Sequence, residues 1–138
     1  MLIDQADLFD GMDRMFIQEF MASTTKQMFN AGDIIFREGE HANYFYTLIE
    51  GSIRLIVGES KTEVYQITHP GEAFGWSSLL DRNYYSATAE CLTPTHLHKI
   101  ERIELDKLLQ KYPERNGTFY KKIAGMIGHR LIECYRQM

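Results

Sequence analysis

The chain has 138 residues, of which 44% are hydrophobic and 12% aromatic, and its 15 basic and 19 acidic side chains give a net charge of −4. This composition excludes an intrinsically disordered chain and argues against a surface that binds nucleic acid non-specifically. No apolar run approaches the roughly 18 residues of a membrane span, and the acidic N-terminus lacks the basic start of a signal peptide. Cys91 and Cys134 are too few for a disulfide framework or a four-thiolate zinc site. We therefore expect one soluble, cytoplasmic domain over residues 1–138 with no membrane partner.

The hydrophobic periodicity changes along the chain from helical to strand-like. Residues 1–24 are predicted to contain a helix whose apolar side chains are Met12, Met15, Phe16, Phe20 and Met21. Over residues 25–100, short β-rich runs alternate with glycines: Met28–Phe29, Ile34–Phe36, Tyr44–Ile49, Ser52–Val57, Val64–His69, Tyr84–Cys91 and Thr95–Ile100. In Ser52–Val57 the alternation directs Ile53, Leu55 and Val57 to one face, as a half-buried strand requires. Many short strands at this spacing predict an antiparallel sandwich or barrel.

Residues 101–138 return to helical periodicity. A first helix is predicted over Glu101–Gln110, and Pro113 sits where the first turn of a second helix tolerates proline. No further proline follows, so we predict one long helix from Pro113 to Met138, weakened locally by its glycines.

The long C-terminal helix carries two neighbouring stripes of side chains. The first follows heptad steps through Gly117, Tyr120, Ala124, Ile127, Leu131, Cys134 and Met138. The second consists of Phe119, Ile123, Met126 and Arg130. Two stripes suit a helix that packs on its own β core and also on the same helix of a second copy. We therefore predict a homodimer through Tyr120, Ala124, Ile127, Leu131 and Cys134, with one broad face buried inside a monomer as the alternative.

Glycines punctuate the β region in specific settings: Gly32 in AGDIIF, Gly39 in REGE, Gly51 in LIEGSIR, and Gly71 and Gly75 in PGEAFG. From about Phe9 to the end, these ordered segments and the flanking helices resemble the cyclic-nucleotide-binding domain of catabolite-activator-like regulators and cyclic-nucleotide-gated channels. The resemblance implies an α+β, mainly β fold: a double-stranded β-helix jelly-roll barrel with a short N-terminal helix and two C-terminal helices. In the regulators the long last helix dimerises. The resemblance also implies a phosphate-cassette-like turn over residues 71–89.

The cassette departs from the family pattern at both of its charged positions. The family's nucleotide binders place a glutamate after the Phe-Gly pair and an arginine before a small residue at the cassette end. Here Trp76 follows Phe74-Gly75, and Tyr85 precedes Ser86. Each lost charge-assisted hydrogen bond costs about 1.5–3 kcal/mol, so ordinary cyclic AMP is expected to bind weakly.

Two arginines are candidates to replace the missing cation. Arg82 lies nearby but out of register, as does Glu72, and Arg130 reaches the pocket if the last helix closes over it. Ser77 either contacts ligand or caps the short helix. The predicted ligand-binding set is Phe74, Gly75, Trp76, Ser77, Ser78, Arg82, Tyr85, Ser86, Ala87 and Arg130. The ligand is expected to be a cyclic nucleotide or another small anionic or aromatic molecule; alternatively, Trp76 fills the pocket and nothing binds.

Other chemistry finds little support in the sequence. His96 and His98 share a strand face, but Glu101 and Glu104 miss the His-x-His-to-glutamate spacing of metal-binding cupins. We expect no metal and no catalytic residues, with a metal-dependent barrel enzyme as a third alternative. The chain stops at Met138, before the helix-turn-helix domain of the resembled regulators. We therefore expect no direct DNA binding, and signalling through the dimer helix or a regulatory protein partner.

Overall fold

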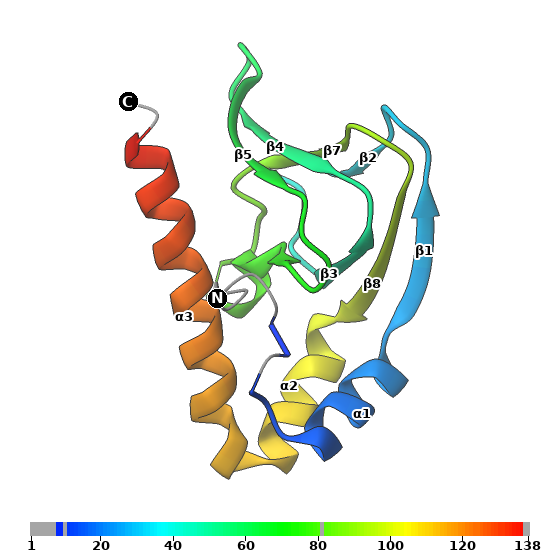
Figure 1. The fold of residues 1–138 in the computed structure, drawn as a ribbon, viewed down its shortest axis with the longest axis vertical. Coiled ribbons are helices and arrows are strands. Elements are labelled where there is room, and N and C mark those ends of the chain that lie inside the picture. Colours follow the sequence, from blue (N-terminus) through cyan, green and yellow to red (C-terminus); the bar gives the residue numbers. More distant parts are fainter. Residues whose placement is uncertain (1–7, 10, 81, 137–138) are drawn as a thin grey trace.

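The computed structural model describes residues 8–9, 11–80 and 82–136, and shows a β barrel flanked by helices (Figure 1). Helix α1 (Arg14–Ser23) precedes the strands, and helices α2 (Arg102–Lys111) and α3 (Pro113–Arg136) follow them. The strands are β1 (Thr25–Phe29), β2 (Ile34–Phe36), β3 (Tyr44–Glu50), β4 (Ile53–Val57), β5 (Thr62–Ile67), β6 (Ala73–Phe74), β7 (Thr88–Cys91) and β8 (Thr95–Glu101). A short 3-10 helix, η1 (Trp76–Leu79), lies between β6 and β7.

The strands form two antiparallel sheets, in the orders β1-β8-β3-β6 and β2-β7-β4-β5. In the first sheet β3 and β8 pair along most of their length, with Tyr44 opposite Glu101 and Leu48 opposite Leu97. Consecutive strands often belong to opposite sheets, as in a jelly roll. The mainly β jelly-roll fold expected from the sequence is confirmed.

Helix α1 begins later than the apolar pattern alone suggests, because Asp13 caps it. The Asp13 carboxylate accepts hydrogen bonds from the backbone N–H groups of Met15 (2.9 Å) and Phe16 (3.2 Å). These bonds satisfy two of the amide donors that a helix start leaves free. Met12 therefore lies before the helix, although it still packs against the core.

Three details of the β region differ from the sequence prediction. Strand β6 was not predicted, because two residues are too few to show periodicity. The predicted strand over Tyr84–Cys91 is shorter, since Tyr85 exchanges backbone hydrogen bonds with Gly39 and Glu40 (both 2.9 Å) and β7 begins at Thr88. In β4 the register shifts between Leu55 and Ile56, so Ile56 is buried and the predicted alternation ends at Leu55.

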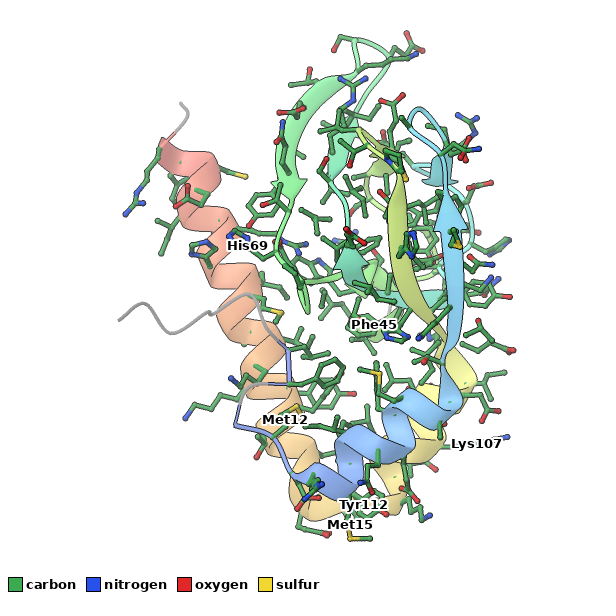
Figure 2. The ribbon with its side chains drawn as sticks, turned by 45° about the vertical axis from the view of Figure 1, so that its right-hand side comes forward. Met12, Met15, Phe45, His69, Lys107 and Tyr112 are labelled. Carbon is green, nitrogen blue, oxygen red and sulfur yellow. The ribbon has the colours of Figure 1, made fainter. Side chains whose placement is uncertain are left out.

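Two apolar clusters hold the fold together. One fills the barrel: Phe36, Ala42, Tyr46, Leu48, Ile53, Ile67, Phe74, Tyr85, Ala89, Cys91 and Leu97. The other joins the barrel to all three helices: Leu8, Phe16, Phe20, Phe45, Ala73, Ile100, Leu105, Leu108, Leu109, Phe119, Ile123 and Met126. Phe45 lies on the helix-facing side of the barrel, and His69 lies near α3 (Figure 2). Helix α3 therefore uses its second predicted stripe to pack on its own chain.

The connection between β3 and β4 depends on Gly51. Its φ is +119°, and a Cβ atom there would lie 2.6 Å from Thr95 Oγ1 and 2.7 Å from Pro94 O. Gly58 also has positive φ (+77°), but a Cβ there would meet nothing closer than 4.0 Å. Alanine substitutions at these two glycines therefore separate two contributions to the loss of stability: the left-handed backbone conformation, present at both, and the steric clash, present only at Gly51.

We expect Gly51→Ala to lower the free energy of unfolding by roughly 2–5 kcal/mol, because overpacking adds to the left-handed strain. Gly58→Ala carries the strain alone and should cost about 1–2 kcal/mol. Urea unfolding followed by circular dichroism measures both. Equal losses in the two variants would contradict the clash at Gly51.

Candidate functional site

The cassette-like turn begins at the end of β6. Gly75 takes a left-handed conformation (φ 74°, ψ 27°), and a Cβ atom there would lie 2.8 Å from Tyr46 Cδ2. The 3-10 helix η1 follows without a side-chain cap, so Ser77 does not cap it. Ser77 is instead buried inside η1, where its carbonyl accepts from Leu80 N (3.2 Å) and Arg82 N (3.3 Å).

Arg130 enters this site from α3. The residue is only 7% exposed, and its guanidinium lies 3.9 Å from the ring centroid of Trp76 and 4.8 Å from that of Tyr65. Nη2 donates to Glu72 Oε2 at 3.4 Å and to the carbonyl oxygen of Ala73. Burial lowers the pKa of Arg130, and the neighbouring Glu72 opposes that shift. A guanidinium out of water needs such partners, and here it finds a carboxylate, a carbonyl and two aromatic faces.

Glu72 is the fixed counter-ion of Arg130. It is 2% exposed, and its Oε1 accepts from the backbone N–H groups of Thr68 (3.2 Å) and His69 (3.3 Å). The imidazole Nδ1 of His69 lies 3.6 Å from the same oxygen. Burial and the adjacent Glu72 carboxylate raise the pKa of Tyr65 to about 12, so its hydroxyl stays protonated at neutral pH.

Tyr85 is part of the barrel core. Its ring stacks on Phe36 at 3.9 Å, and its hydroxyl donates to Tyr44 O at 2.7 Å. The same hydroxyl accepts from Tyr44 N at 3.2 Å. Burial raises the pKa of Tyr85. The ring and its hydroxyl are thus committed to the fold, and this position offers no positive charge to a ligand.

Several of these groups line a small, partly open cavity of about 40 Å³, whose wall consists of Phe36, Leu55, Gly75, Trp76, Ser77, Tyr85, Ser86, Ala87 and Arg130. The structure therefore brings most of the predicted ligand-binding residues together. Phe74 is not in the wall: it is fully buried in the barrel and stacks on Tyr46 at 5.1 Å. Arg82 is exposed and does not line the cavity, so Arg130 is the arginine that does. The side chain of Ser78 lies outside the described residues.

Sequence reasoning left Glu72 and Tyr65 out of the site. Tyr65 lies on β5, and only the fold brings it beside Arg130. The available signal was Arg130 itself: an arginine in an otherwise apolar, core-facing stripe needs a buried acid nearby. The Pro-Gly-Glu segment supplies one.

The first stripe of α3 faces away from the barrel along much of its length. Tyr120 and Leu131 are 42% and 49% exposed, and Ala124 is also exposed. Ile127 is half-buried, and Cys134 Sγ donates to Val64 O of β5 at 3.4 Å. Met138, predicted to end this stripe, lies outside the described residues.

In the described part of the chain, the two strand histidines belong to no cluster of three or more His, Cys, Asp or Glu side chains placed to bind an ion. His98 Nδ1 lies 3.3 Å from Thr24 Oγ1, and burial, aided by Lys26, lowers the pKa of His98. Within the described residues, no helix combines the length and apolarity needed to cross a bilayer.

The site thus consists of a jelly-roll barrel, a glycine-led turn after β6 and a long helix that contacts this turn. A family model described as the cyclic nucleotide-binding domain matches residues 26–112, more than half of the chain. The chain belongs to this family.

The chain is also similar in sequence to curated relatives and in fold to solved structures. The chain is 24% identical over 129 residues to the human cyclic nucleotide-gated channel beta-1, covering 91% of this chain and 10% of the channel. It is 26% identical over 131 residues to the cyclic AMP receptor protein of Thermus thermophilus, covering 92% of this chain and 58% of that protein. The chain thus spans only part of either relative. A cyclic nucleotide-binding domain from Methylobacillus flagellatus shares the fold with a TM-score of 0.83 and 17% identity, covering 98% of this chain and 77% of that one.

The interaction energy of the buried pair Arg130–Glu72 can be measured with a double-mutant cycle. Arg130→Met leaves Glu72 buried without its counter-ion, and we expect it to lower the free energy of unfolding by about 3–5 kcal/mol. The double variant Arg130→Met/Glu72→Leu removes both charges and should recover much of that loss, since apolar packing replaces the pair. Urea unfolding of the wild type, both single variants and the double variant gives the coupling.

Arg54 provides a matched control, because it pairs with Glu90 on the barrel with both side chains partly exposed (31% and 23%). Arg54→Met should cost about 1 kcal/mol or less. Additive losses at Arg130 and Glu72 would contradict the coupling.

Proposed function

We propose that the chain is a small-molecule-sensing regulatory module, without catalytic activity, whose remodelled cassette reports ligand through α3. The observation that carries this proposal is the position of Arg130. One side chain belongs both to the cavity wall and to the long helix. A ligand that enters the cavity therefore touches α3 directly.

The coupling requires ligand to bind two positions of α3 with different affinities. The C-terminal half of α3 meets the barrel through Arg130 and through the contact of Cys134 with β5. Changing the partners of Arg130 therefore changes a principal attachment of that half. A shift of α3 would then be read by a second copy of the chain or by a regulatory protein.

A purely structural role is the second candidate, and the cavity volume favours it. Sites for drug-sized ligands occupy about 300–1,000 Å³, whereas this cavity holds about 40 Å³. Trp76 and Tyr85 take up space that charged recognition groups occupy in the family's nucleotide binders. In this alternative the pocket is vestigial and the chain serves as a dimerisation module.

Ligand binding and helix response can be measured together. We expect titration with cyclic AMP or cyclic GMP, followed by Trp76 fluorescence and calorimetry, to show weak binding, because the charged pair of the cassette is replaced. Trp76 is the one tryptophan of the chain. Adenosine and guanosine serve as uncharged counterparts. At saturating ligand, hydrogen exchange should change in residues 127–136 of α3 and stay constant in α1. Binding with unchanged exchange in α3 would overturn the sensing mechanism, and no binding of any probe would favour the structural role.

The proposed dimer uses the exposed stripe of α3. We expect Leu131→Glu to shift a dimer to monomer in sedimentation velocity, because it would place one carboxylate from each copy in an apolar seam. Met15→Glu is the control, since Met15 is a 59% exposed apolar residue on α1. Loss of dimer in both variants, or in neither, would contradict a seam through Leu131.

A further inference from the structure

We propose that Glu72 makes the cassette cavity select against anions, so that its ligand is a small uncharged molecule bearing a hydrogen-bond acceptor. The inference deepens the proposed function, on which it rests for the place where ligand binds. It depends on two observations: Glu72 neutralises the charge of Arg130, and the Arg130 Nε–H group has no hydrogen-bond partner among the described residues.

Among the described residues that line the cavity, Arg130 is the one that carries a charge. Its guanidinium is already neutralised by Glu72, which two backbone amides and the surrounding core hold in place. An anion brought to Arg130 would have to share it with a buried carboxylate. Like charges at such short range, in a site of low dielectric, repel each other strongly.

The carboxylate is part of the fold and does not leave easily. The residue is 2% exposed, so it would gain little solvation if Arg130 turned to a ligand. Displacing it would leave a buried charge without its counter-ion. Glu72 therefore takes the ion-pairing position on Arg130 that an anionic ligand would need.

Arg130 still has one donor to offer. Its Nε–H is buried and finds no hydrogen-bond partner among the described residues. A buried unpaired donor is unfavourable, and a ligand acceptor that reaches it through a movement of the covering side chains would satisfy it. A carbonyl oxygen or ring nitrogen does so without adding charge.

The test compares probes that differ by the cyclic phosphate, using calorimetry on the full chain. In the wild type, cyclic AMP should bind no more tightly than adenosine, and inorganic phosphate should not bind at millimolar concentration. In Glu72→Gln the amide keeps an acceptor for Thr68 and His69 but loses the charge. Affinity for cyclic AMP and inorganic phosphate should then rise at least tenfold, while affinity for adenosine stays within a factor of three.

Glu90→Gln is the matched control, because it removes a carboxylate that is paired with Arg54 outside the cavity wall. It should leave all three affinities unchanged. Adding Arg130→Met to Glu72→Gln should abolish the gain. If Glu72→Gln does not fold, Glu72→Asp keeps the buried charge but moves it one methylene away from Arg130, and a gain of severalfold is expected.

Two results would overturn the proposal: wild-type binding of cyclic AMP tenfold tighter than adenosine, or a folded Glu72 variant with no gain for phosphate or cyclic AMP. These outcomes are separate from failure of the sensing role. Gain of anion binding in Glu72→Gln with unchanged hydrogen exchange in α3 would support the selectivity and reject the sensing.

Discussion

The buried contact between Arg130 and Glu72 is the interaction on which the arrangement of the site depends. A guanidinium removed from water must keep its partners, and those of Arg130 come from different parts of the chain: the turn before η1, Trp76 of η1, and Tyr65 of β5. Because each partner belongs to a different element, none of these elements can move far without disturbing the charge at their centre. A change in the position of α3 is therefore expected to change the shape of the cassette, and the reverse.

A second constraint acts on the part of the cavity wall that belongs to the barrel. The stack of Tyr85 on Phe36 and the hydroxyl bonds to the Tyr44 backbone fix this side of the cavity to the barrel. One wall thus belongs to the rigid barrel and the other to a helix. The sensing proposed above requires such an asymmetry, with one surface fixed and one that responds to ligand.

Much of the fold follows from sequence because the signals are local. The helical stripe of Phe119, Ile123 and Met126 predicts the buried face of α3, and the glycine settings with alternating runs predict the barrel. The register shift after Leu55 and the two-residue strand β6 carry no periodic signal and could not be foreseen.

The site was predictable only in part, for a related reason. The cavity-lining residues near Gly75 and Ser86 lie in one segment, so a motif reveals them. The partners of Arg130 are set by distances through space: Glu72 lies 58 positions away along the chain. An arginine in an apolar stripe indicates that a buried acid exists, but which one depends on how α3 crosses the barrel.

The stack of Tyr85 on Phe36 also bears on how this cassette can change over evolutionary time. An arginine at position 85 would have to leave the barrel core, abandoning Phe36 and the Tyr44 backbone, while the Gly39–Glu40 turn holds its main chain in place. A glutamate at position 76 would remove one of the two rings over Arg130 and add a carboxylate close to Glu72. Tyr85 and Trp76 are thus both part of the packing around the site. Installing an arginine at position 85 or a glutamate at position 76 would therefore require the surrounding packing to change at the same time.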